Sequence, residues 1–327
     1  MLLVRSYISL PAAATGAIAV IGNFDGVHLG HQHILDHARK LAKAKAAPLA
    51  ALVFEPHPRQ FFVPQSPPFR LTSLRSKLAL LEARGVDTVV ALRFGKALAA
   101  MPAEDFIAKV LVEGLQVRHV VVGHDFAFGR GRAGTTESLR REGDRLGFAV
   151  DVVAAVKSGT EIFSSNRIRA FLREGAVGQA AQQLGHWWEV NLRVRRGDAR
   201  GRVLGFPTAN LEMGRLIAPL AGVYAVRARV GGENDQVWAD GVANFGVRPT
   251  VGGVRELLEV HLFGFAGDLY RRHLRVAFVD FIRPEMKFSG LDQLRRQISA
   301  DCDAAKAKLA DPANRADRFA SLGPALN

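Results

Sequence analysis

Residues 17–31 read AIAVIGNFDGVHLGH, an apolar run followed by a glycine-rich turn that ends in two histidines. The apolar run Ala17–Ile21 is short and continuous, which predicts a fully buried strand. A helical pattern follows from about Leu29 to Lys45, so the turn joins a strand to a helix. Glycines let backbone approach a bulky anion, and the N-terminal amides of a helix favour negative charge. We therefore predict a phosphate site at this turn.

The segments that follow continue the alternation of strand and helix. Further apolar strands are predicted at 49–54, 87–92, 117–122 and 148–153, with helices at 73–83, 102–112 and 136–146. This order predicts a Rossmann-like parallel sheet that helices cover on both faces. Ligands of such sheets lie beyond the carboxyl ends of the strands. We therefore expect chemistry in the loops after Ile21, Phe54 and Val122.

The pattern changes after about Leu184. Strand-like segments now recur without long helices between them, among them 188–194, 222–230, 237–244, 257–262 and 274–282. This spacing predicts an antiparallel β-barrel, and an amphipathic helix at about 291–309 closes it. We expect the barrel to have six strands. The expected fold class is α/β plus β. The expected domains are 1–184 and 185–312, with a C-terminal tail at 313–327.

Composition narrows the class of protein without choosing its ligand. The net charge is +13, from 44 basic and 31 acidic residues among 327, which favours phosphate, nucleotide or nucleic acid. Cys302 is the one cysteine, so the chain cannot form an internal disulfide or a cysteine-based metal site. No apolar run reaches the roughly 18 residues of a membrane helix, and the N-terminus lacks a signal pattern. We expect a cytoplasmic protein that has no membrane partner.

Two groups in the first half fit phosphate chemistry. His28 and His31 share one helix face and can donate hydrogen bonds to charge that develops at phosphorus. Taken alone, paired histidines at a helix start could also be a metal site or a cap, but the glycines beside them favour phosphate. Ser164 and Ser165 offer hydroxyls at the start of a second helix, and Arg169 lies one turn later, able to fork onto phosphate oxygens. Plain N-capping also explains the serine pair.

The second half contains its own candidate phosphate-binding segment, Gly197–Asn210, which reads GDARGRVLGFPTAN. Its glycines make a loop that can fold over phosphates. Thr208 and Asn210 offer neutral oxygens two residues apart, which suits Mg²⁺ bound with ATP, since this ion prefers few protein oxygens plus phosphates and water. Thr and Asn are also common turn residues, so the pair alone is weak evidence for a magnesium site.

Taken together, these segments resemble the bifunctional riboflavin kinase/FMN adenylyltransferases, the prokaryotic FAD synthetase family. GNFDGVHLGH resembles the His-x-Gly-His signature of nucleotidylyltransferases, and FEPHP at 54–58, VVGHDFAFG at 121–129 and SSNRIR at 164–169 agree with it. GDARGRVLGFPTAN resembles the riboflavin kinase signature. Segments 222–226, 241–250, 259–263 and 267–270 follow in that family's order, and the resemblance spans about 17–308.

The resemblance implies two ATP-dependent steps with Mg²⁺: riboflavin to FMN in the C-terminal domain, then FMN to FAD with pyrophosphate release in the N-terminal domain. It implies that His28, His31, Ser165 and Arg169 hold the ATP phosphates. Glu259 is implied as the general base that takes the proton of the ribityl hydroxyl. The other expected cofactor contacts are Gly22, Asn23, Phe24, Asp25, Gly26, Gly30, Asp125, Ser164, Gly197, Arg202, Gly205, Pro207, Thr208, Asn210 and Arg283.

Three aromatic residues and one proline are candidates for contact with the flavin. Phe54, Pro56, Phe62 and Phe126 would suit apolar flavin contacts, although core packing is the alternative role for each of them. The sequence departs from the family pattern at Asn166, His186, Gly264 and Arg271. None of these positions carries a group assigned to the chemistry.

Two other functions are weighed against this one. An adenylyltransferase with an inactive kinase barrel is disfavoured because Thr208, Asn210 and Glu259 are all present. Nucleic-acid binding is suggested by arginines within 193–202 and 271–275, but the barrel lacks an aromatic-rich strand on which bases would stack. We therefore expect small-molecule substrates, no nucleic-acid partner, and a monomer or weak homo-oligomer.

Overall fold

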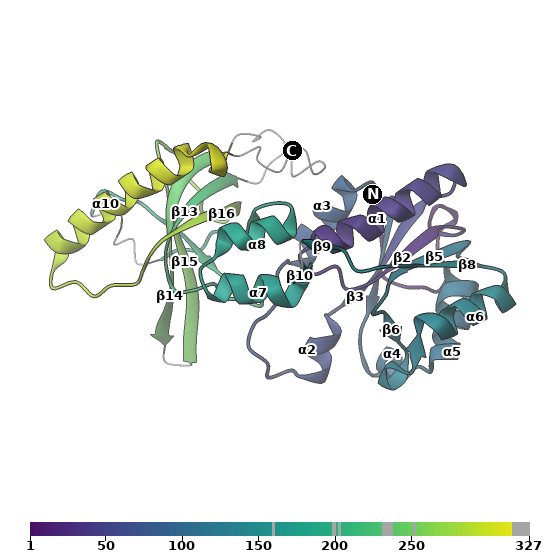
Figure 1. Ribbon diagram of the computed structural model, residues 1–327. Coiled ribbons are helices and arrows are strands. Elements are labelled where there is room, and N and C mark those ends of the chain that lie inside the picture. The colour runs from purple at the N-terminus through teal and green to yellow at the C-terminus, as the bar shows by residue number, and fades with distance from the viewer. Residues whose placement is uncertain (159–160, 198–200, 202–203, 231–237, 251–252, 316–327) are drawn as a thin grey trace. The chain divides into compact units, whose positions relative to one another are not determined.

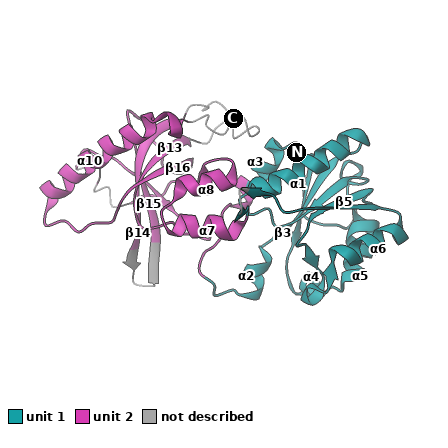
Figure 2. Ribbon diagram, viewed as in Figure 1, with its two compact units in different colours: residues 1–66, 77–163, 326 teal, residues 67–76, 164–325, 327 magenta. Residues whose placement is uncertain are grey.

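The computed structural model describes the whole chain except residues 159–160, 198–200, 202–203, 231–237, 251–252 and 316–327. The chain divides into two compact units (Figure 2). The first contains Met1–Ser66 and Lys77–Phe163, and the second contains Pro67–Ser76 and Ser164–Ala325. Each unit is described here by itself.

The first unit is built on a six-stranded sheet whose neighbouring strands all run parallel, as predicted. The strand order is β1-β4-β3-β2-β5-β8. The five predicted strands are confirmed to within two residues, and β1 adds an edge strand that was not predicted. The strands are β1 Leu2–Val4, β2 Ile18–Ile21, β3 Leu49–Glu55, β4 Thr88–Arg93, β5 His119–Gly123 and β8 Ala149–Val153.

Helices cover both faces of this sheet (Figure 1). On one face, α1 (Leu29–Ala44) packs Leu35 and Ala38 against the sheet. On the other, the predicted helix 102–112 is one α turn, α5 (Ala103–Asp105), that continues as a π-helix, η2 (Phe106–Gly114). The apolar pattern did not distinguish the two helix types, because it marks only the buried residues. The remaining elements are η1 Ala12–Ala14, α2 Pro58–Phe62, α3 Leu74–Ala83, α4 Lys96–Ala99, β6 Ala127–Phe128, η3 Arg130–Arg132, β7 Gly134–Thr135, β9 Lys157–Ser158 and β10 Glu161–Ile162.

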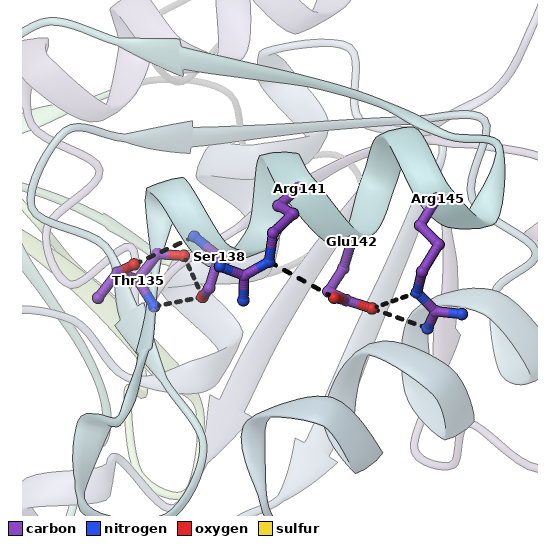
Figure 3. A network of polar contacts seen from close by, with 5 residues as sticks. All are labelled: Thr135, Ser138, Arg141, Glu142 and Arg145. Atoms are coloured by element: carbon purple, nitrogen blue, oxygen red, sulfur yellow. Dashed lines mark hydrogen bonds and ion pairs between the residues drawn. The ribbon is translucent and has the colours of Figure 1, made fainter.

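The helix α6 (Thr136–Leu146) begins where the sequence predicts, and its cap explains why (Figure 3). The Thr135 side chain accepts from the Ser138 amide at 3.2 Å, and the Ser138 hydroxyl accepts from the Thr135 amide at 2.9 Å. This reciprocal capping satisfies donors that a helix start otherwise leaves unpaired. On the same helix, Glu142 pairs with Arg145 at 2.7 Å.

The second unit is the predicted antiparallel barrel. Its six strands follow the order β11-β16-β13-β14-β15-β12, and the bridge between Arg195 and Asn210 joins the two ends. The Arg195 amide donates to the Asn210 carbonyl at 2.8 Å. The strands are β11 Trp188–Arg193, β12 Ala209–Glu212, β13 Gly222–Val230, β14 Ala239–Thr250, β15 Gly253–Leu262 and β16 His273–Pro284.

Helices cover the barrel from two sides. The predicted closing helix is α10 (Leu291–Ala310), followed by η4 (Pro312–Asn314), and it packs Cys302 and Leu309 on Val223 and Val242. The barrel interior instead packs against α7 (Ser165–Arg173) and α8 (Val177–Leu184). These two helices belong to the second unit by packing, whereas the sequence-based boundary places them in the first domain. Among the described residues, no helix combines the length and apolar character needed to cross a membrane.

Candidate functional site

The first candidate site lies where the strand order of the parallel sheet reverses, between β2 and β5. Loops beyond the carboxyl ends of such strands are where ligands of open α/β sheets bind. Here the loop Gly22–Val27 leaves β2 and enters α1. The loop after β5 returns close by, since a Cβ on Gly123 would lie 3.3 Å from Asp125 Oδ1 and 3.4 Å from Ile34 of α1.

The two predicted histidines are brought together at the start of α1. Their rings stack with centroids 3.7 Å apart. His28 is the N-cap, and its Nδ1 accepts from the His31 amide at 3.4 Å. A Cβ on Gly30 would lie 3.2 Å from the His28 ring, so this glycine leaves room for the imidazole. The capping interpretation therefore holds for His28, and it does not conflict with binding phosphate through other ring atoms.

The loop residues around these histidines are largely buried. Phe24 and Asp25 are 1% and 2% exposed. The Phe24 ring lies between His31, at 5.1 Å between centroids, and Gly22, where a Cβ would come within 3.3 Å of it. Phe24 thus packs as core as well as belonging to the predicted phosphate loop. Asn23 and Gly26 complete that loop.

A metal site is the alternative interpretation of the histidine pair. Over the described ranges of the chain, no three His, Cys, Asp or Glu side chains are grouped as a metal site would require. A zinc site in proteins normally draws on three or four such ligands.

Aromatic rings gather at the carboxyl ends of β3 and β4. Phe54, Phe61, Phe62 and Phe94 make edge contacts with centroids 5.2–5.9 Å apart. Phe62 is 63% exposed, so this group reaches the surface. Phe61 and Phe94 were missed from the sequence, although Phe94 directly follows a strand and the rule that selected the other loops could have found it. Phe126 instead stacks on Phe128 at 5.4 Å.

Three predicted phosphate ligands belong to the second unit. Ser164 is the N-cap of α7 and accepts from the Arg167 amide at 3.2 Å, so N-capping is one of its roles. Ser165 is the first residue of α7. Arg169 is buried, donating to the Phe69 carbonyl at 2.8 Å and to Asn166 Oδ1 at 2.7 Å. Their joint role with the histidines of the first unit stays a prediction.

The second candidate site is built around the start of β12. A Cβ on Gly197 would lie 2.5 Å from the Asn210 amide nitrogen, so the backbone of this glycine rests directly on that side chain. A Cβ on Gly201 would lie 3.3 Å from Thr208 Oγ1. The structure therefore places Gly197 and Gly201 of the predicted loop close to the two predicted oxygen ligands. Arg202 lies outside the described residues.

Two further predicted residues shape the same loop. Gly205 has φ of +87°, a backbone conformation that favours glycine. The Pro207 carbonyl lies 2.9 Å from Nδ1 of His261, which comes from β15. The contact between Pro207 and His261 holds the segment before Thr208 against β15.

Glu259 lies between two asparagines in the register of the sheet. It is paired with Asn210 of β12 on one side and with Asn244 of β14 on the other. Directly opposed residues of antiparallel strands share a face, so three polar side chains stand in one row. The alternate residues Leu258 and Phe245 are buried in the barrel core. Asn244 was not singled out from the sequence, because strand pairing is needed to place it beside Glu259.

Arg283 donates hydrogen bonds to Asp301 of α10. Its Nε and Nη2 donate to the two carboxylate oxygens of Asp301 at 2.8 and 2.6 Å, and its Nη1 donates to the Pro284 carbonyl at 2.8 Å. Asp301 is 5% exposed and also accepts from Gln297. Arg283 therefore ties α10 to β16, and its contact with a flavin stays a prediction.

Comparison with known proteins follows the same division of the chain. The family described as FAD synthetase matches residues 10–167, and the family described as riboflavin kinase matches residues 184–309. The bifunctional riboflavin kinase/FMN adenylyltransferase of Escherichia coli K12 is 41% identical over 302 residues, 92% of this chain and 96% of that protein. The chain belongs to the bifunctional riboflavin kinase/FMN adenylyltransferase family. The resemblance inferred from the motifs is thereby confirmed.

Other relatives of this family agree along the whole chain. The bifunctional riboflavin kinase/FMN adenylyltransferase of Pseudomonas fluorescens is 42% identical over 316 residues, 96% of this chain and 100% of that protein. A crystal structure from Streptococcus pneumoniae, titled as a macrolide-efflux protein, superposes with a TM-score of 0.82 at 28% identity. It covers 93% of this chain and 98% of that one, so the two-part fold is shared over nearly its full length.

The structure describes the surroundings of three of the departures from the family pattern. Arg271, where the family usually has glycine, keeps a positive φ of +64°. Its amide donates to the Val194 carbonyl at 3.1 Å, and its carbonyl accepts from Arg193 Nε at 2.9 Å, so strand contacts hold this conformation. Gly264 also has φ of +64°. His186 is buried, with Nδ1 2.8 Å from the Trp187 carbonyl.

Proposed function

We propose that the second unit phosphorylates riboflavin to FMN and that the first unit adenylylates FMN to FAD. The family of this chain carries both activities, riboflavin kinase and FMN adenylyltransferase, for FAD biosynthesis. The observation that supports the assignment most directly is the row Asn210–Glu259–Asn244 beside the loop that holds Thr208. It combines a carboxylate with neutral oxygen ligands at one place in the barrel.

In the kinase step, we propose that Glu259 accepts the proton of the ribityl hydroxyl as that oxygen attacks the γ-phosphorus of ATP. The bond from γ-phosphorus to the bridging oxygen breaks, and ADP leaves. Thr208 and Asn210 would hold Mg²⁺ with the ATP phosphates, and the ion would neutralise phosphate charge. The neutral donor set and the close approach of Gly197 to Asn210 fit such a site. Gly205, Pro207 and Arg202 are proposed to complete the loop over the phosphates.

In the adenylyl step, His28, His31 and the first amides of α1 are proposed to hold the ATP phosphates. A phosphate oxygen of FMN attacks the α-phosphorus, and the bond to pyrophosphate breaks. Hydrogen-bond donors and the positive end of the helix dipole stabilise the charge that develops there. Gly22 to Gly26 and Gly30 shape this anion site. Ser164, Ser165 and Arg169 are proposed as further phosphate ligands because the family motif matches them.

The flavin ring is proposed to lie on the aromatic group at the carboxyl ends of β3 and β4. Phe54, Phe61, Phe62 and Phe94 present edges and faces there, and planar aromatic rings attract one another in such arrangements. Asp125 follows β5, which is separated from β3 by β2, and is proposed to contact the nucleotide or flavin. We propose that Arg283 borders the flavin of the kinase step. The two activities are proposed to divide at 184/185, in a monomer or weak homo-oligomer that acts in the cytoplasm.

One product assay tests both steps. The full chain is incubated with riboflavin, Mg²⁺ and ATP labelled at either the α- or the γ-phosphate, and flavins are separated by chromatography. The γ-label should appear in FMN, and the α-label should appear in FAD. If neither flavin forms, the proposed function is wrong. FAD formed from supplied FMN, without FMN formed from riboflavin, would instead identify an adenylyltransferase with an inactive barrel.

A further inference from the structure

The loop that leads into α1 has a backbone conformation that its own residues disfavour. Phe24 and Val27 have φ of +47° and +42°, and Gly26 between them has φ of +84°. A β-branched residue with positive φ is a genuine outlier, because its side chain crowds the backbone. Such conformations persist only where the surroundings hold them, and they concentrate at functional sites. Val27 directly precedes His28, so whatever holds Val27 also sets the position of that histidine.

Gln32 holds this loop by two bonds. Its side-chain amide donates to the Val27 carbonyl at 2.8 Å, and its backbone amide donates to the His28 carbonyl at 2.9 Å. Gln32 is 3% exposed and Val27 is 1% exposed, so no solvent replaces the side-chain bond if it is lost. A buried carbonyl without a donor is unfavourable, and the loop would move to satisfy it.

Arg84 fixes the orientation of that amide. Its guanidinium donates to Gln32 Oε1 from a position that is 8% exposed. A guanidinium can only donate, so the oxygen of Gln32 must face Arg84. The NH₂ group of Gln32 is thereby directed at the Val27 carbonyl. Arg84 follows α3, which is remote in sequence from the loop and supplies no residue to the candidate site.

We infer that Gln32 and Arg84 are positioning residues for the adenylyl transfer step. They hold the Val27 carbonyl so that His28 and His31 keep the stacked arrangement that faces the ATP phosphates. Neither residue needs to contact the substrate. The inference rests on the proposed function of the first unit, and it assigns a task to two buried polar side chains that the chemistry itself does not use.

Three variants of the full chain test it, with FAD formation from FMN and Mg-ATP as the readout. Gln32→Glu keeps an oxygen for Arg84 but places an acceptor against the Val27 carbonyl. Arg84→Met removes the donor, and Arg84→Lys keeps one. A displacement of the reacting groups of about 1 Å can cost about 100-fold in rate. We expect kcat to fall about 10- to 100-fold in Gln32→Glu and Arg84→Met, with KM for FMN within about twofold, and largely to recover in Arg84→Lys.

Two controls separate positioning from folding. FMN formation from riboflavin by the same variants should be unchanged, since it belongs to the other unit. Leu80→Ala removes a core side chain of α3 that is 9% exposed, and it should lower thermal stability without lowering kcat. A double variant, Gln32→Leu with Arg84→Met, tests whether the two residues act together. Adding Arg84→Met to Gln32→Leu should lower kcat for FAD formation little further, because the two residues act through one bond.

The outcomes are distinct. An unchanged kcat in both Gln32→Glu and Arg84→Met would overturn the inference, and so would an equal loss of kcat in Leu80→Ala. If a Gln32 variant does not fold, the contrast between Arg84→Met and Arg84→Lys decides the matter. A wild-type chain that makes no FAD from FMN would refute the proposed function instead.

Discussion

Replacing Glu259 by glutamine should slow riboflavin phosphorylation strongly while leaving the barrel intact. Glu259 stands in the sheet between Asn210 and Asn244, both of which carry amides that donate and accept. A glutamine of the same length can therefore occupy the same place in the row, where either amide could donate to it or accept from it. What it cannot do is take a proton from the attacking hydroxyl. The substitution thus removes the proposed base and changes little else.

The magnitude follows from the role of the base. General base catalysis contributes about 10²- to 10⁴-fold in rate. This corresponds to about 3–5 kcal/mol in the activation free energy, at about 1.4 kcal/mol for each factor of ten. We expect kcat for FMN formation in Glu259→Gln to fall by about 1000-fold, with KM for riboflavin nearly unchanged because the ground-state contacts persist.

The assay follows FMN and FAD by chromatography at saturating Mg-ATP, with riboflavin as substrate in one arm and FMN in the other. Glu256→Gln is the matched control. It changes the same residue type on β15, but three positions away, so the side chain leaves the strand on the opposite face. The pKa of Glu256 is raised by burial. The assignment of the base is refuted if kcat for FMN formation falls less than about tenfold in Glu259→Gln, or if it falls as much in Glu256→Gln. It is also refuted if FAD formation from FMN falls in parallel.

Three further substitutions probe other parts of the chain. His31→Ala should lower FAD formation from FMN and spare FMN formation, and an unaffected FAD rate would remove this histidine from the mechanism. Asp301→Ala removes the buried carboxylate that accepts two bonds from Arg283, which keeps its bond to the Pro284 carbonyl. The substitution should lower the unfolding free energy of the second unit by about 2–3 kcal/mol. Urea unfolding followed by tryptophan fluorescence measures this loss, because Trp187, Trp188 and Trp238 all lie in that unit. A loss below about 1 kcal/mol would contradict it. Asp151→Asn tests pH dependence. Burial alone would raise the pKa of Asp151, but hydrogen bonds from His37 and His119 outweigh it, and the pKa is lowered. Its stabilisation is therefore present above the ordinary carboxylate pKa and lost as pH falls through the lowered value. The melting temperature of the wild type should exceed that of Asp151→Asn at neutral pH, and the two values should converge in acid. A difference that stays constant with pH would refute the stabilising role of the contacts between Asp151 and the two histidines.

Much of the fold could be predicted because local pattern and final structure agree. The parallel strands are continuous apolar runs, and burial on both faces of the sheet requires exactly such runs. The start of α6 is predictable because Thr135 and Ser138 carry the cap in the sequence itself. The paired histidines were found because their spacing places them on one face of a helix whose start the glycines mark.

Other features depend on contacts between distant segments. Asn244 stands beside Glu259 only because β14 pairs with β15 in one particular register, and that register is not visible in either strand alone. The Gln32–Arg84 contact joins residues 52 positions apart. Arg283 was predicted to border the flavin because the family motif surrounds it, whereas its partner Asp301 lies on a helix whose orientation only packing defines.

The assignment of α7 and α8 illustrates how packing, rather than sequence order, defines a structural unit. Ile168, Leu172 and Leu184 are fully buried in the core cluster of the barrel. The short segment 67–76 joins them, since the Leu71 carbonyl accepts from Trp188 Nε1 at 3.0 Å. A boundary drawn where the strand pattern changes cannot detect this, because an amphipathic helix shows which face is buried but not against which partner. The family models match up to 167 and again from 184, so most of these two helices lies between the matched ranges. Residues 164–184 therefore lie mostly between the two matched ranges in sequence, and they pack on the barrel core.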